Sequence, residues 1–205
     1  MKEIRIGKQA LVIVSIAFIV LASCKKEKTD PNIVYKYYNL SLTDTTSLTV
    51  QELKIDLDID GDSVMDYTLK GIFDTLESDT IIRQIILQHG DTNNNKMLAT
   101  ATLLPNGIYT SVLKQLNEDD VIDSNSIGYN NTGDVVLRVF KGPDLFGYFG
   151  FYDDKYKFIG IKFKIGTETH YGWLRLRLSF DKKTCTLLDG AYQKLADKKI
   201  AAGDI

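Results

Sequence analysis

FIGIKFKI-GTET-HYGWLRLRL, residues 158–178, alternates between apolar and polar side chains on both sides of a short polar turn. Because successive side chains of a strand point to opposite faces of its sheet, this period of two predicts a β-hairpin with one apolar face. With Gly166–Thr169 as the turn, the apolar face pairs Ile165 with His170, Phe163 with Gly172 and Ile161 with Leu174. A turn of two residues would keep the same faces, whereas an odd-length turn would not.

The opposite face of this hairpin is predicted to carry a ladder of cations and aromatic rings. Lys164 is expected opposite Tyr171 and Lys162 opposite Trp173, with Arg175 continuing the row. One interpretation is a set of cross-strand cation–π pairs whose long stems cover the sheet. The other is a platform for an anionic polymer or a glycan, with Trp173 and Tyr171 stacking on sugar rings. These five residues are the candidate ligand-binding set. His170 lies on the apolar face and is interpreted as a packing residue.

Outward from the hairpin, short β-branched and aromatic runs separated by Gly, Asn and Asp predict strands throughout the chain. They cover residues 47–58, 66–73, 80–88, 96–104, 135–141, 145–152, 156–165, 171–180 and 185–188. This pattern favours an all-β fold, a single antiparallel sandwich or open barrel. One short helix is expected at Ser111–Asp123, with Val112, Leu113 and Leu116 as its apolar stripe. Cys185 lies in a strand-like run and is interpreted as a small core residue.

The strongest chemical signal is the acidic run DLDIDGDSVMDY at residues 56–67. Calcium binds six to eight oxygen ligands, and alternate aspartates on a tight turn can direct several carboxylates at one centre. An EF-hand starting at Asp56 is excluded because Tyr67 occupies the twelfth position, where a glutamate is required. Starting at Asp58, the pattern is D-x-D-G-D-x-x-x-D. The alternative is a solvated acidic turn without a metal.

This second pattern resembles the calcium loop of FG-GAP and integrin-type repeats, which is a turn between two β-strands. The resemblance implies that calcium is bound by the side chains of Asp58, Asp60, Asp62 and Asp66 and by the carbonyl of Val64. The sequence departs from the pattern at Ser63, where a second glycine is usual. If that position needs a positive φ, the turn is strained. A single copy of the loop favours a structural ion over a catalytic one.

The N-terminus has the features of an export signal. Lys2, Arg5 and Lys8 precede an apolar run from residue 10 to residue 22, which is short of the roughly 20 residues of a membrane-spanning helix. The ending Leu21-Ala22-Ser23-Cys24 resembles the bacterial lipobox, which implies lipidation of Cys24 and a membrane anchor. Lys25 after the cysteine implies the outer membrane, on either its periplasmic or its surface face. The expected organisation is a signal peptide at 1–23, a lipidated tether at 24–34 and a β domain at 35–205.

Charge and cysteine content narrow the function. Removal of residues 1–23 takes away three basic residues and one acidic residue, leaving 22 basic and 26 acidic residues and a net charge of −4. Nucleic-acid binding is therefore not expected, because such domains are normally basic. Lipidation of Cys24 would leave Cys185 as the remaining thiol, so no internal disulfide is expected.

The C-terminal strings around Tyr171-Gly172-Trp173, Gly190-Ala191-Tyr192 and Ile200-Ala201-Ala202-Gly203 are similar to those of a group of uncharacterised secreted all-β bacterial proteins. The resemblance implies an envelope address and lends no reaction. No hydrolase, zinc or phosphate-loop motif is present. We therefore expect a non-catalytic envelope lipoprotein that binds a glycan or a protein partner. The alternatives are a polysaccharide-acting enzyme with a carboxylate pair and a structural subunit of an outer-membrane assembly.

Overall fold

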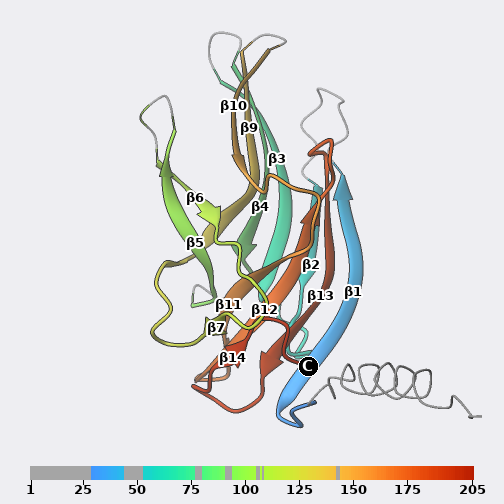
Figure 1. Ribbon diagram of the computed structural model, residues 1–205, viewed down its shortest axis with the longest axis vertical. Coiled ribbons are helices and arrows are strands. Elements are labelled where there is room, and N and C mark those ends of the chain that lie inside the picture. Colours follow the sequence, from blue (N-terminus) through green and yellow to red (C-terminus); the bar gives the residue numbers. More distant parts are fainter. Residues whose placement is uncertain are drawn as a thin grey trace, which may run out of the picture.

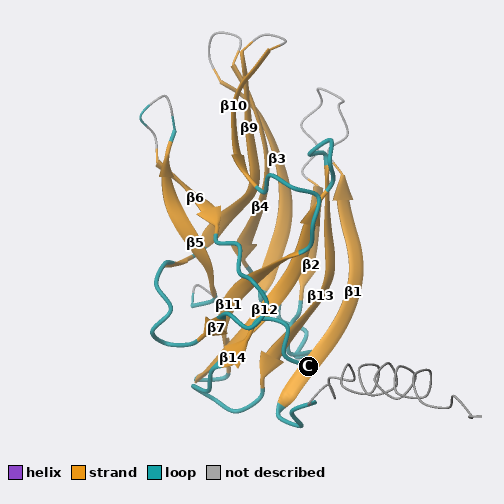
Figure 2. Ribbon diagram, in the orientation of Figure 1, coloured by secondary structure: helices purple, strands orange, loops and turns teal. Residues whose placement is uncertain are grey.

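The computed structural model describes residues 29–43, 53–76, 80–90, 94–104, 107, 109–141 and 144–205 (Figure 1). The predicted signal peptide and Cys24 lie outside these residues. The described part is all-β, as Figure 2 shows, and contains no helix that is long and apolar enough to cross a membrane. The all-β prediction is therefore confirmed.

Each predicted run overlaps a strand of the structure, whereas the strands at residues 33–43, 109–113, 121–122, 129–130 and 200–201 lie outside the predicted runs. The main sheet is built from β1 (Ile33–Thr43), β2 (Leu53–Leu57), β3 (Tyr67–Leu76), β4 (Thr80–His89), β5 (Lys96–Leu103), β6 (Tyr109–Leu113), β8 (Tyr129–Asn130), β9 (Thr132–Lys141), β10 (Asp144–Gly150), β11 (Lys157–Ile165), β12 (Glu168–Leu178) and β13 (Thr184–Gln193). A separate two-stranded ribbon joins β7 (Val121–Ile122) to β14 (Ile200–Ala201). β1 begins at Ile33, two residues before the expected start of the domain.

The main sheet curves into a nearly closed barrel (Figure 1). Its order is β1-β13-β12-β11-β5-β6-β9-β4-β3-β2, with β10 on β9 and β8 on β5. The pairs are antiparallel apart from one parallel bridge between Val112 of β6 and Asp134 of β9. The two end strands approach each other, since Lys36 of β1 donates a 2.7 Å hydrogen bond to the carbonyl of Asp58, just after β2. The acidic loop therefore lies where the barrel closes.

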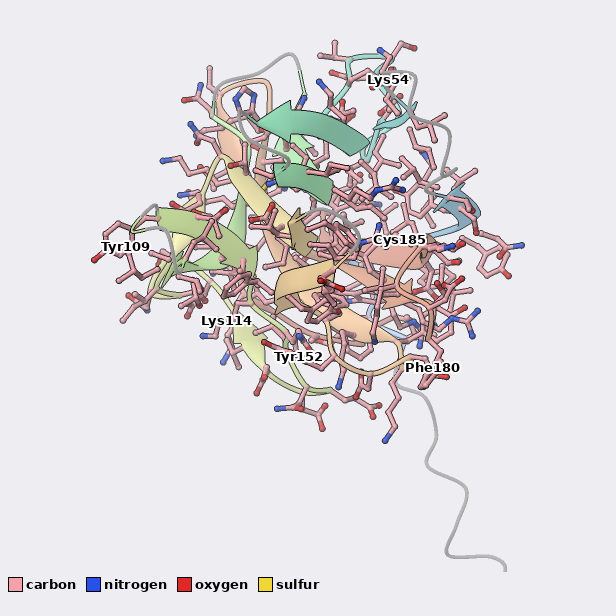
Figure 3. The ribbon with its side chains drawn as sticks, turned by 90° about the horizontal axis from the view of Figure 1, so that it is seen from above. Lys54, Tyr109, Lys114, Tyr152, Phe180 and Cys185 are labelled. Atoms are coloured by element: carbon pink, nitrogen blue, oxygen red, sulfur yellow. The ribbon has the colours of Figure 1, made fainter. Side chains whose placement is uncertain are left out.

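Two hydrophobic clusters stabilise the fold. The larger one fills the barrel and includes Leu69, Leu87, Ile161, Phe163 and Leu174, each at most 1% exposed. Cys185 also belongs to this cluster, and Figure 3 shows it within the mass of side chains. The smaller cluster lies on the other face of β12, where the β7–β14 ribbon packs. It consists of Leu98, Leu116, Ile122, Tyr171, Trp173, Ala191, Ile200 and Ala202. Apolar packing therefore covers both faces of the C-terminal hairpin.

The predicted helix at Ser111–Asp123 is wrong. Its first residues extend β6 to Leu113, and its last residues contain β7. Between them, Leu116 donates its backbone N–H to the carbonyl of Phe158 at 2.9 Å. Leu113 packs in the barrel core whereas Leu116 packs in the second cluster. The apolar residues are therefore divided between two cores, and strand partners satisfy a backbone that a helix would have satisfied internally.

The predicted hairpin of residues 158–178 is present, with a shorter turn. Gly166 and Thr167 form the turn, Gly166 at a φ of 60°, and Ile165 pairs with Glu168. The faces are as predicted, because a two-residue turn has the same parity as a four-residue one. The individual pairs are shifted by two residues, so Lys162 lies opposite Tyr171 and Trp173 lies opposite Gly160.

Candidate metal centre

The acidic loop connects β2 to β3 and is organised by its own aspartates. The two carboxylate oxygens of Asp58 accept hydrogen bonds from the backbone N–H groups of Gly61, at 2.6 Å, and Ser63, at 2.9 Å. Asp60 accepts one from the N–H of Asp62 at 3.1 Å. Aspartate side chains thus pair with backbone N–H groups that, in a tight turn, have no backbone carbonyl to bind. The loop conformation is thus encoded by its local sequence.

Asp66 anchors the far end of the loop to the barrel. Its carboxylate is buried, with 4% of the residue exposed. One oxygen accepts a 2.8 Å hydrogen bond from the N–H of Ile59, and the other accepts a 2.9 Å bond from the side-chain amide of Asn95. Asn95 itself is 0% exposed and accepts a 3.0 Å bond from the N–H of Lys164. The loop is therefore tied through one buried amide to β11.

The carboxylates of Asp58, Asp60 and Asp66 form a cluster that could hold a metal ion. One ligand oxygen from each lies within 4.8 Å of the other two. Three convergent carboxylates are hard oxygen donors of the kind that Ca²⁺ and Mg²⁺ prefer. The structure thus brings together three of the five predicted ligands.

The other two predicted ligands are on the same loop but outside this cluster. Asp62 is exposed, and its carboxylate accepts a 2.7 Å hydrogen bond from the N–H of Val64. Val64 is 40% exposed. Asp62 and the Val64 carbonyl therefore remain predictions for an ion-bound loop.

Electrostatics in the cluster disfavour three negative charges without a cation. Burial, reinforced by the charge of Asp60, raises the pKa of the Asp66 carboxyl to about 6. Burial and the neighbouring charges of Asp62 and Asp58 raise the pKa of Asp60 as well. Partial burial acts in the same sense on Asp58, but the N–H groups of Gly61 and Ser63 outweigh it and hold its pKa below the usual range. A bound cation would favour the charged form of all three groups.

The predicted strain at Ser63 is present. Gly61 adopts a φ of 89° and Ser63 a φ of 72°, both in the left-handed region. Glycine occupies that region freely, whereas a residue with a β-carbon does so at a cost. Ser63 therefore stores backbone strain that a glycine at this position would avoid.

Two residues that complete the centre were not identified from the sequence. Asn95 is 29 residues beyond Asp66, and Lys36 is 22 residues before Asp58. Tyr38 also lies close, since burial and the charges of Asp66 and Asp58 raise its pKa. No local pattern marks these residues, because strand pairing alone brings them to the loop.

The interpretation of the C-terminal hairpin as an open binding platform is wrong, because the two aromatic residues of the expected ladder are buried. Tyr171 is 3% exposed and Trp173 1% exposed, both in the second cluster under the β7–β14 ribbon. Their rings therefore do not form an open stacking platform. The cations use other partners: Lys162 lies 4.6 Å from the ring centre of Tyr129, and Lys164 donates a 2.7 Å bond to Thr169.

Arg175 pairs with a buried carboxylate of β13. Its Nε donates to Asp189 at 2.8 Å, and its Nη2 also donates to this carboxylate. The guanidinium also lies 5.6 Å from the ring centre of Phe158. The cation–π interpretation therefore holds for Lys162 and Arg175. The ring of Tyr129 comes from outside the hairpin, whereas Phe158 is the cross-strand neighbour of Arg175 within it.

The two predicted packing residues are confirmed. Cys185 is 0% exposed, and burial raises the pKa of its thiol to about 12. His170 is 2% exposed, and its Nδ1 lies 3.0 Å from the carbonyl of Gln193. Its ring packs between Phe163 and Tyr192. Neither side chain is placed to act as a nucleophile.

Comparison with protein-family models, with curated proteins and with solved structures found no match to the chain.

Proposed function

We propose that the chain is a non-catalytic, lipid-anchored module of the cell envelope whose β domain is stabilised by one calcium ion and binds a glycan or a protein partner. The convergence of Asp58, Asp60 and Asp66 at the closure of the barrel carries the calcium part of this proposal. An ion held there would connect the end of β2 to the start of β3. It would also offset the repulsion among the three carboxylates.

Calcium suits the donor set better than a transition metal. The cluster contains carboxylate oxygens and, within the described residues, no His or Cys donor. Such hard oxygens favour Ca²⁺ or Mg²⁺ over zinc or copper. Ca²⁺ also tolerates the irregular, flexible coordination of a short loop, whereas Mg²⁺ requires near-octahedral geometry. The envelope compartment implied by the N-terminal signal would expose the loop to extracellular calcium.

Thermal unfolding of the mature domain with calcium and with a chelator tests this proposal. At a calcium concentration 100 times the dissociation constant, binding adds about 2.7 kcal/mol, which corresponds to a rise of roughly 5–10 °C in a domain of this size. Asp60→Asn is expected to abolish the rise, because it removes one cluster charge and one oxygen. Asp56→Asn is the matched control, since Asp56 is two residues before the loop and pairs with Lys54 instead. An unchanged wild-type melting temperature would refute the calcium site.

The lipid anchor is tested separately by metabolic labelling with palmitate in a Gram-negative host. The full chain is expected to incorporate the label and to sediment with outer membranes. Cys24→Ser is expected to lose both properties. Cys185→Ala is expected to keep the label, because the thiol of Cys185 is buried and is not the predicted lipidation site. Label that persists in Cys24→Ser would contradict the lipidation site.

A further inference from the structure

A cavity of about 340 Å³ opens on the outer face of the sheet, beside the second hydrophobic cluster. Its volume is within the range of about 300–1,000 Å³ that is usual for small-molecule sites. Strand β12 contributes its base, β1 and β11 its sides, and the segments before β7 and after β14 its rim. The side chains that define it are Tyr35, Glu118, Tyr156, Phe158, Trp173 and Arg175.

Aromatic rings form the walls of this cavity. Phe158 meets Trp173 edge to face at 5.2 Å between ring centres, and Tyr35 approaches the same indole at 6.4 Å. Trp173 is almost fully buried, so it fixes the other rings from below, whereas Tyr35 is 45% exposed. Gly203 keeps one side open, because a β-carbon there would lie 3.3 Å from Glu118 and 3.5 Å from Phe158. The cavity is thus a pre-formed aromatic recess.

A buried polar network organises the base of the recess. The carboxylate of Asp189 is 1% exposed and accepts hydrogen bonds from Arg175 and, at 2.8 Å, from the hydroxyl of Tyr35. Within the described residues Arg175 uses two of its five N–H groups in this pair, which leaves three donors for a ligand. Its charge is already compensated by Asp189. Glu118 at the rim adds acceptor oxygens and a negative charge.

This combination selects a particular ligand chemistry. Aromatic walls with a planar donor and a planar acceptor suit a molecule that has apolar C–H faces and hydroxyl groups around its edge. A phosphate or a sulfate is disfavoured, because Arg175 is neutralised and Glu118 is acidic. We propose that the cavity binds a sugar unit of a neutral glycan, with Tyr35 and Tyr156 against its ring face and Arg175 and Glu118 on its hydroxyl groups. This inference rests on the proposed binding function and names its ligand class.

The site lies where the described chain begins. The N–H of Asp30 donates a 3.2 Å hydrogen bond to the carbonyl of Ile205, and Ile205 itself lines the cavity. A glycan held there would lie at the end of the domain that the expected lipid tether enters.

The test is binding of the mature domain to an array of neutral hexose and N-acetylhexosamine oligosaccharides, with uronate oligosaccharides as the charged comparison. Affinity for the strongest ligand is then measured by titration calorimetry. Tyr156→Ala and Glu118→Gln are each expected to lower this affinity at least tenfold. Both change partly or fully exposed side chains, so the fold is expected to persist, and circular dichroism checks it. Tyr109→Ala is the control, since Tyr109 is 72% exposed, projects from the periphery of the molecule (Figure 3) and does not line the cavity.

The possible outcomes test the sugar site and the calcium site separately. Failure of the wild-type domain to bind any neutral saccharide, or equal binding by the cavity variants and the wild type, would overturn the sugar site. A stronger response to uronates than to neutral sugars would overturn its neutral specificity. Calcium-dependent melting measured on the same samples separates the two proposals, because a stable calcium-bound domain without saccharide affinity would leave the metal site intact and reject the sugar site.

Discussion

The side-chain amide of Asn95 donates hydrogen bonds to both the carboxylate and the carbonyl of Asp66, at 2.9 Å and 3.2 Å. Both residues are buried, and the Asn95 oxygen accepts the N–H of Lys164 at 3.0 Å. One side chain therefore joins the acidic loop to β11. The candidate metal centre and the barrel are thus parts of one hydrogen-bonded unit.

Replacing this amide is expected to destabilise the whole domain. Asn95→Ala would remove three hydrogen bonds and leave a buried carboxylate oxygen and a backbone N–H unpaired. Each such group costs about 1–3 kcal/mol, so we expect a loss on the order of 3 kcal/mol in urea unfolding. Asn94→Ala is the control, because Asn94 is the adjacent residue and is exposed. Equal stability of the two variants would show that the bridge contributes little.

Relief of backbone strain in the acidic loop is expected to stabilise the protein. Ser63 has a φ of 72°, a conformation that costs a residue with a β-carbon about 1–2 kcal/mol relative to glycine. Ser63→Gly should therefore raise the free energy of unfolding by about 0.5–1 kcal/mol, after the larger chain entropy of glycine in the unfolded state is deducted. Ser63→Ala keeps the β-carbon and should give no such gain. A gain in the alanine variant as well would show that the hydroxyl, not φ, is responsible.

Asp134 is expected to make stability depend on pH. Its carboxylate is 2% exposed and accepts 2.5 Å hydrogen bonds from Gln84 and Thr110. Burial raises its pKa above the ordinary value, so the folded state binds a proton more tightly than the unfolded state. Its contribution to stability is therefore greatest at low pH and is lost as pH rises through the raised pKa.

Asp134→Asn tests this dependence in chemical unfolding between pH 4 and pH 7. Asparagine can still accept from Gln84 and can donate to the Thr110 oxygen. We expect the free energy of unfolding of the variant to exceed that of the wild type most at pH 7. This difference should shrink toward pH 4. Asp153→Asn should show the opposite sign at pH 7, because a 3.1 Å pair with Lys157 lowers the pKa of Asp153. A pH-independent difference for Asp134→Asn would contradict the assignment.

The two arginines of β12 are expected to differ in importance. Arg175 pairs with Asp189, whose side chain is 1% exposed, whereas Arg177 is exposed and lies 5.0 Å from the ring centre of Tyr156. Arg175→Met would leave a buried carboxylate with Tyr35 as its hydrogen-bond donor and should cost on the order of 3 kcal/mol. Arg177→Met should cost less than about 1 kcal/mol. Similar unfolding curves for both variants would argue against a buried ion pair.

Local sequence predicted the parts of the site that a single turn contains. The spacing from Asp58 to Asp66 brings its carboxylates together because the loop reverses the chain within nine residues, and the hydrogen bonds from Gly61 and Ser63 hold that reversal. The local sequence did not determine which of the aspartates is buried. Asp66 is the buried member because Asn95 and the end of β2 enclose it, and neither belongs to the motif.

Sequence alone determined the strands and the two faces of the hairpin at residues 158–178, because a period of two depends on backbone geometry and on the parity of the turn. It did not determine what covers each face. Trp173 and Tyr171 lie on the polar face by pattern, yet they are buried, because the β7–β14 ribbon brings Ile122 and Ile200 onto them. Tertiary structure made that decision, since two strands that are 78 residues apart in sequence pair there to bury apolar surface that neither can bury alone.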